Sequence, residues 1–306
     1  MFEPIIIHND EKVLTVDLHQ KLLLYEIKAS DQIPPPEVAL KIDNAIIGTL
    51  GNILSIIGKA KSRKSFFIGM AVSASVAKEN VISVLTNELP ESQRNVLYFD
   101  TEQGKYHVQK ALKRICTITG VSEPTNLNTY GLRALNPIER AELIEYAIYN
   151  TPNLGIVFID GIKDLITSIN DEEQATMIVS KLMKWSEEKN ILIVTVLHQN
   201  KGDNNARGHI GTELNNKAET VLSVSKSTEN EMVSIVQAEM CRNLEPESFA
   251  FEIDQNGIPY ISDYVANDKP SKKLTKKELF DLYKSEIVTD IFATSTELGI
   301  GYGQLL

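Results

Sequence analysis

The octapeptide Gly58-Lys59-Ala60-Lys61-Ser62-Arg63-Lys64-Ser65 follows an apolar run at Asn52–Ile57 and opens a stretch, Lys64–Lys78, whose pattern predicts a helix. The predicted order is strand, loop, helix. In that order the loop and the first helical turn direct unpaired backbone N–H groups, and the positive end of the helix dipole, toward an anion. Lys64 would then reach the β- and γ-phosphates of a nucleotide, and the Ser65 hydroxyl would bind Mg²⁺. The octapeptide therefore predicts a phosphate-binding loop.

One residue departs from the usual G-x-x-x-x-G-K-[ST] pattern, because Arg63 stands where the second glycine belongs. Its Cβ crowds a turn that glycine passes freely. We expect Arg63 to tolerate this position by turning its guanidinium toward phosphate or toward a nearby carboxylate. The alternative for the whole octapeptide is a basic surface turn between a strand and a helix, so the assignment depends on the rest of the chain.

The composition indicates a globular protein that carries excess negative charge. The 306 residues are 42% apolar and 7% aromatic, which is ordinary for a packed α/β core of one large or two moderate domains. The formal net charge is −10, so the surface as a whole repels nucleic acid. Contact with DNA would have to come from a local basic loop or from the lumen of a ring.

The cysteine count and the apolar segments predict a cytoplasmic protein. Cys116 and Cys241 belong to no C-x-x-C pair, so they predict reduced thiols and neither a disulfide framework nor a zinc site. Met1–Ile7 has no basic leader pattern, and no run of eighteen apolar residues occurs. We expect neither export nor membrane insertion.

The chain predicts three parts: an N-terminal arm at residues 1–33, a core domain at 34–266, and a linker with a C-terminal helical, incompletely winged-helix-like segment at 267–306. Strands alternate with helices in the core. The predicted strands are Asn95–Asp100, Leu127–Leu132, Gly155–Asp160 and Ile191–Leu197, and the predicted helices are Lys105–Thr119, Pro137–Tyr149 and Gln174–Lys189. This alternation predicts an α/β fold with a mostly parallel sheet, helices on both faces, and ligands at the carboxyl ends of the strands.

The pattern changes after Leu197. A polar loop is predicted at His198–Gly211, and three further strands are predicted at Thr220–Val224, Met232–Ala238 and Ser248–Ile253. No helix-length segment separates these three strands. We expect them to join the sheet edge as antiparallel strands.

Three predicted strands end in residues that nucleotide hydrolysis requires. Asp160 would bind Mg²⁺ through water, and Glu102 could orient and deprotonate the attacking water. His198 and Gln199 could sense the γ-phosphate. The alternatives are a turn or cap residue for Asp160, a solvated loop carboxylate for Glu102, and an ordinary loop histidine for His198.

With these motifs in place, residues 34–261 resemble the RecA/DnaB-type ATPases of the hexameric helicase superfamily, and most of all the RepA-type plasmid helicases and related ATPases of mobilizable elements. The resemblance implies a catalytic glutamate at Glu102, a Mg²⁺ aspartate at Asp160 and a sensor at His198 or Gln199. It also implies a basic finger that enters the neighbouring subunit's nucleotide site. Met240-Cys241-Arg242-Asn243 matches that family's K-x-R-N pattern except at Met240, which leaves Arg242 as the one finger.

The resemblance and the motifs together predict an ATP- and Mg²⁺-dependent homo-oligomer, such as a hexamer. It would act on single-stranded DNA with replication or mobilization proteins, as a helicase or DNA-associated motor. Lys201 and Arg207 are the candidate DNA contacts, and Arg207 could instead face a nucleotide across a subunit boundary. Arg242 could instead form a surface ion pair. The alternative function is a nucleotide-dependent switch that grips a protein partner.

The phosphate-binding loop makes a direct prediction for Lys64→Ala. The change removes the mobile ammonium that the pattern assigns to the phosphates, and we expect ATP affinity to fall by about 100-fold or more. Titration with a fluorescent ATP analogue measures it. Undiminished affinity would show that the loop does not bind phosphate.

Overall fold

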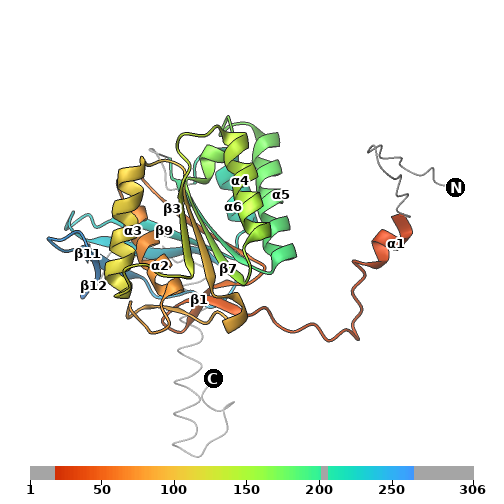
Figure 1. The fold of residues 1–306 in the computed structure, drawn as a ribbon, viewed down its shortest axis with the longest axis horizontal. Helices are drawn as coiled ribbons and strands as arrows, with labels where there is room; N and C mark the ends of the chain where they lie inside the picture. Colours follow the sequence, from red (N-terminus) through yellow and green to blue (C-terminus); the bar gives the residue numbers. More distant parts are fainter. Residues whose placement is uncertain (1–17, 201–205, 265–306) are drawn as a thin grey trace, which may run out of the picture. The chain divides into compact units, whose positions relative to one another are not determined.

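The computed structural model describes residues 18–200 and 206–264 (Figure 1). The chain divides into two units, residues 1–36 and 37–306. In the first unit the short helix α1 (Leu18–Leu23) belongs to a segment, residues 18–36, that is exposed throughout. The predicted C-terminal segment at 267–306 lies outside the described residues.

The second unit is built on a nine-stranded sheet with the order β12-β11-β10-β9-β3-β8-β7-β5-β6. Neighbouring strands from β9 to β6 are parallel, and β10, β11 and β12 extend one edge with antiparallel pairing. The strands are β3 (Ile53–Gly58), β5 (Asn95–Asp100), β6 (Leu127–Gly131), β7 (Leu154–Asp160), β8 (Leu192–His198), β9 (Thr220–Lys226), β10 (Ser234–Cys241), β11 (Phe249–Ile253) and β12 (Pro259–Ser262).

Helices cover both faces of this sheet, as Figure 1 shows. Helices α2 (Lys64–Val76) and α3 (Lys105–Thr119) lie on one face. Helices α4 (Pro137–Asn150), α5 (Glu172–Lys189) and α6 (Gly208–Lys217) lie on the other. The predicted α/β class, a mostly parallel RecA-like core with antiparallel strands at its edge, is confirmed. Within residues 18–200 and 206–264, no helix is both long and apolar enough to cross a bilayer.

Local sequence signals account for the central elements. All seven residues of β7 are buried, as expected for a strand covered on both faces. Asn136 and Glu139 form a reciprocal capping box at the start of α4. Asp171 caps α5, and Asn190 ends it in a left-handed conformation. These elements match the predicted segments to within about two residues, which is the usual uncertainty of a helix or strand end.

The region after β8 differs from the prediction in two ways. The strand predicted at Thr220–Val224 is β9, and it pairs parallel to β3 instead of adding to the antiparallel edge. Helix α6 was not predicted, because its two glycines and two asparagines are poor helix formers. Ile210 and Leu214 are fully buried against the sheet, so tertiary packing outweighs local propensity there. The crossover through α6 is what allows β9 to run parallel.

A second, three-stranded sheet was also missed. It has the order β2-β1-β4 and consists of β1 (Val38–Ile42), β2 (Ala45–Thr49) and β4 (Leu85–Asn87). Two short 3-10 helices complete the described elements: η1 (Glu91–Gln93) and η2 (Ile162–Leu165). The small sheet packs into the same core as α2 and α3.

Candidate functional site: a phosphate loop facing three strand ends

The candidate site lies where four parallel strands end together. Gly58 at the end of β3 pairs in register with His198 at the end of β8, and Asp100 at the end of β5 pairs with Asp160 at the end of β7. A cavity of about 410 Å³ opens at this edge. It is lined by residues 61–66 of the loop and by Glu102, Gln103, Asp160, Gly161, Lys163 and residues 196–198.

The predicted phosphate loop has the geometry of one. At Gly58, any Cβ would meet the Val224 carbonyl at 2.4 Å and Ser62 Oγ at 2.7 Å, so the close approach of β9 requires glycine there. Helix α2 begins at Lys64 and directs its N-terminal N–H groups toward the cavity. The buried Ser62 Oγ has no hydrogen-bond partner, so the loop keeps a polar group available for a ligand.

Arg63 adopts the left-handed conformation that the missing glycine would supply, with φ of 72°. Its guanidinium Nη1 donates a hydrogen bond to the Met232 carbonyl and lies 3.4 Å from Ser234 Oγ. Of the two expected partners of the guanidinium, the carboxylate was wrong, and the phosphate stays a prediction. Arg63 joins the phosphate loop to the β9–β10 connection through the hydrogen bond that the Met232 carbonyl accepts.

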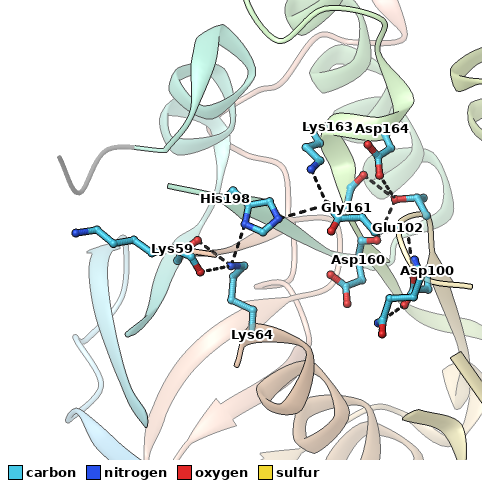
Figure 2. Close-up of polar contacts among 12 residues, drawn as sticks. Lys59, Lys64, Asp100, Glu102, Asp160, Gly161, Lys163, Asp164 and His198 are labelled. Atoms are coloured by element: carbon cyan, nitrogen blue, oxygen red, sulfur yellow. Dashed lines mark hydrogen bonds and ion pairs between the residues drawn. The ribbon is translucent and has the colours of Figure 1, made fainter. Parts of the chain in front are cut away.

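Lys64 begins a chain of side-chain contacts that crosses the cavity. Its ammonium donates to the carbonyls of Gly58 and Lys59, both at 2.8 Å, and lies 3.2 Å from Nδ1 of His198 (Figure 2). Because an ammonium can only donate, Nδ1 accepts, and the ring proton resides on Nε2. Burial lowers the pKa of Lys64 to about 8, although the carboxylates of Asp160 and Glu102 oppose the fall.

Asp160 and Ser65 fit the requirements of a Mg²⁺ site. Asp160 is buried, and its Oδ2 has no hydrogen-bond partner. Burial raises the pKa of Asp160 to about 7, with a further contribution from Asp100, while a hydrogen bond with Ser65 opposes the rise. A buried carboxylate oxygen without a partner is costly unless a ligand satisfies it. A hard cation that prefers oxygen ligands would do so.

Glu102 is positioned by the residues on either side of it in the β5 loop. Asp100 Oδ1 accepts hydrogen bonds from the backbone N–H groups of Glu102 and Gln103, at 3.0 and 2.7 Å. The Thr101 hydroxyl lies 3.0 Å from the Asp160 carbonyl and 2.9 Å from that of Gly161. The loops that follow β5 and β7 are therefore joined, which places Glu102 beside the Mg²⁺ candidates.

The carboxylate of Glu102 is held by two side chains at one oxygen. Its Oε1 lies 2.9 Å from Lys163 Nζ and 3.4 Å from His198 Nε2, and Figure 2 shows both contacts. The hydrogen bond with His198, followed by that with Lys163, lowers the pKa of Glu102 to about 2 despite its burial. Glu102 is thus ionised at neutral pH, and its second oxygen, Oε2, takes part in neither of these two contacts.

Lys163 is a site residue that the sequence analysis missed. It lies in η2, three residues after Asp160, and reaches back over Gly161 to Glu102. Gly161 permits this turn: its φ is 108°, and a Cβ there would meet Thr101 Oγ1 at 2.3 Å and Glu102 Cγ at 2.9 Å. The signal was the segment Asp160-Gly161-Ile162-Lys163-Asp164, in which a glycine and a cation directly follow the predicted Mg²⁺ aspartate.

The two sensor candidates are placed differently. His198 lines the cavity and connects Lys64 with Glu102. Gln199 does not line it. Its backbone N–H donates to the Gly58 carbonyl, and it forms a bridge with Ala206. The structure therefore brings His198 to the site as a side chain and Gln199 as part of the backbone support.

Of the two candidate DNA contacts, the structure describes Arg207, which does not line the cavity. Arg207 is exposed at the N-cap of α6, and its backbone N–H donates to the His198 carbonyl. It is joined to the sensor strand but does not line the cavity. Lys201 lies outside the described residues.

Arg242 lies near the amino-terminal ends of the parallel strands, whereas its own phosphate loop lies at their carboxyl ends. It follows Cys241, which pairs with Thr220 at the start of β9, and Thr220 in turn pairs with Leu54 at the start of β3. The phosphate loop begins at the other end of β3, about 13 Å further along the strand. Arg242 is exposed, and its Nη2 donates to the Lys217 carbonyl at 3.3 Å. It cannot enter the cavity of its own subunit without unpairing β10.

Comparison with known proteins agrees with this geometry. Residues 20–204, more than half of the chain, match the family model of an AAA domain. The chain belongs to this family and is a P-loop ATPase. No curated protein matches the chain.

The raised pKa of Asp160 predicts how stability depends on pH. Its folded-state pKa of about 7 exceeds the ordinary 3.8, so the folded state binds more protons and loses stability as pH rises from about 4 to 7. We expect nucleotide-free Asp160→Asn to be more stable than the wild type at pH 8, by as much as about 4 kcal/mol, and the difference to vanish near pH 4. Denaturant unfolding across this pH range measures it.

The exposed Asp263 provides a matched control, since Asp263→Asn removes a solvated carboxylate and should leave stability unchanged. Addition of Mg²⁺-ATP should stabilise the wild type and not Asp160→Asn. If Asp160→Asn were less stable than the wild type at pH 8, other groups of the free protein would already stabilise the Asp160 carboxylate. The carboxylate would then not require a cation.

Proposed function

We propose that the protein is an oligomeric, ATP-hydrolysing motor that acts on DNA, as a helicase or related translocase in replication or mobilization of a mobile element. The observation that carries the proposal is the division of the site. The cavity contains Lys64, Asp160, Glu102 and His198, whereas Arg242 lies near the amino-terminal ends of the parallel strands, where it would face another copy of the chain.

Each residue in the cavity has a role that its contacts support. The loop N–H groups and Lys64 would bind the phosphates. Ser65 and Asp160 would hold Mg²⁺, which when bound neutralises phosphate charge. Glu102 would orient the attacking water and accept its proton at Oε2, which the contacts with Lys163 and His198 leave open. Phosphate that attracts Lys64 would release His198 from it, so His198 is placed to relay phosphate occupancy to Glu102.

Besides Lys64, three cations of the same subunit line the cavity: Lys61 in the phosphate loop, and Arg63 and Lys163, both of which are already bound. Arg63 is bound to the Met232 carbonyl, and Lys163 is paired with Glu102. An arginine contributed by a neighbouring subunit can accelerate phosphoryl transfer by about 10³- to 10⁵-fold. Hydrolysis would then require assembly into a ring or filament.

The second candidate function is a nucleotide-dependent switch that binds a protein partner. The net charge of −10 favours it, since an acidic surface repels DNA. Both functions use the same ATPase site. They differ in whether nucleic acid changes the rate of turnover.

Single-stranded DNA distinguishes the two functions. We expect a poly-dT oligonucleotide to raise the steady-state rate of ATP hydrolysis several-fold, because a motor couples turnover to its track. A coupled assay of ADP release measures it. Glu102→Gln is the control for contaminating ATPases, since it keeps the loop that binds Mg²⁺-ATP but lacks the proton acceptor. A rate that DNA leaves unchanged would favour the protein-binding switch.

Mixing two inactive variants tests whether the site is shared. We expect Arg242→Ala and Lys64→Ala subunits, each nearly inactive alone, to recover part of the wild-type rate when mixed. A mixed interface can pair an intact phosphate loop with an intact arginine. Specific activity of the wild type should also rise with protein concentration.

Light scattering provides the control for assembly in these mixtures. Mixed oligomers that form but stay as inactive as both parents would contradict a shared site. In that case Arg242 would serve the local contact with the Lys217 carbonyl alone.

A further inference from the structure

Helix α3 has a charge opposite to that of the protein as a whole. The chain carries a net charge of −10, yet α3 contains Lys105, Lys110, Lys113 and Arg114 and no acidic residue. Helices α4 and α5, on the other face of the sheet, mix both signs. Among the described helices, α3 therefore carries the largest net positive charge.

The lysines of this helix are exposed and have no partner of opposite charge. Lys105, Lys110 and Lys113 are all exposed, and within the described ranges none of them forms an ion pair. On α5, by contrast, Lys181 and Lys184 pair with Glu145 and Glu188. The α3 face is thus a positive field without internal compensation, which an external anion can neutralise.

The same face contains a small hollow with a rigid wall. A cavity of about 150 Å³ lies between α3 and the β11–β12 turn, and its lining includes Lys110, Lys113, Thr117 and Asn256. Arg114 forms the wall: its Nε donates to the Gly257 carbonyl at 2.9 Å, and its guanidinium lies 4.0 Å from the centre of the Phe66 ring. The Thr117 hydroxyl already donates to the Lys113 carbonyl, and the Asn256 amide donates to Asp254 Oδ2. The two ammonium groups without an ion pair, beside the fixed arginine, are therefore the groups that suit one phosphate.

An exposed aromatic ring continues this face toward the ATPase site. Tyr106 is 72% exposed and lies four and seven residues before Lys110 and Lys113, so the three side chains share one stripe about 10 Å long. Proteins that bind single-stranded nucleic acid without sequence preference combine basic side chains with aromatic rings. The phosphates pair with the cations, and the bases stack on the rings. An acidic peptide would use the lysines but not the ring face.

We propose that the basic face of α3, defined by Tyr106, Lys110 and Lys113 with the adjoining hollow, binds the backbone of single-stranded nucleic acid. This rests on the proposed DNA-associated function and assigns it a surface outside the loop at Lys201–Arg207. The face also lies close to the candidate ATPase site. Helix α3 begins at Lys105, directly after the loop in which Asp100 accepts hydrogen bonds from the backbone N–H groups of Glu102 and Gln103. A nucleic-acid strand bound on α3 would therefore contact the helix that directly follows the loop containing Glu102.

The experiment compares the full chain with Lys110→Gln/Lys113→Gln and with the control Lys184→Gln/Lys189→Gln on α5. Binding of a fluorescein-labelled dT oligonucleotide is followed by anisotropy over a series of salt concentrations. We expect the α3 variant to bind about ten-fold or more weakly at low salt, and the slope of log affinity against log salt to fall in magnitude by about 1.4. The α5 control should match the wild type.

Two further measurements separate the steps of the proposal. Tyr106→Ala should weaken binding about five-fold or more while leaving the salt slope unchanged, because stacking releases no counterions. The basal ATPase rate without DNA should be unchanged in the α3 variant, and its stimulation by DNA should be lost. Intact basal turnover also shows that the variant is folded.

Several outcomes overturn the assignment. If the α3 variant binds DNA with the affinity and slope of the wild type, another surface holds the strand, and the DNA-associated function stands without α3. If the wild type binds no DNA while α3-dependent binding to poly-glutamate is found, the face serves an acidic protein partner. If DNA neither binds nor stimulates hydrolysis, the proposed function itself fails.

Discussion

The parallel register of β3, β8, β7 and β5 is the constraint on which the site depends. Because Gly58 pairs with His198 and Asp100 pairs with Asp160, four strands that are far apart in the chain end at one edge of the sheet. Each of these strands is almost wholly buried, so a slip of register would be resisted by the packing of helices on both faces. The cavity lies at this edge because parallel strands present their carboxyl ends together.

Within that edge, charges are satisfied by one another. Lys64 contacts His198, His198 contacts Glu102, and Glu102 contacts Lys163. In the proposed function, a nucleotide would compete with these contacts, and the competition would link occupancy of the phosphate loop to the position of the Glu102 carboxylate. Asp160 stands outside the chain of contacts with one oxygen unpartnered. Among its described residues, the cavity therefore has two buried polar atoms without a partner, Asp160 Oδ2 and Ser62 Oγ, beside a chain of paired side chains.

Sequence reasoning succeeded where a local pattern was strong. The phosphate loop, the flanking strand and helix, and the ends of β5, β7 and β8 follow from apolar runs that stop at polar residues, and the structure joins Lys64, Glu102, Asp160 and His198 around one cavity. Sequence reasoning failed where long-range packing, instead of a local pattern, determined the secondary structure. Helix α6 has poor helix formers, and the hairpin of β1 and β2, although Asp43-Asn44 between apolar runs is a hairpin signal, was too short to stand out.

The sequence by itself determined the class of fold and most of the polar groups that line the cavity, because hydrophobic periodicity and the order of strand, loop and helix are local properties. Tertiary structure alone decided which groups meet. Arg63 turns to the Met232 carbonyl, Lys163 reaches Glu102, and Arg242 lies near the amino-terminal ends of the parallel strands. These outcomes depend on strand order and on the direction of β9, which bring together residues 25 to 169 positions apart, and no local pattern encodes such pairings.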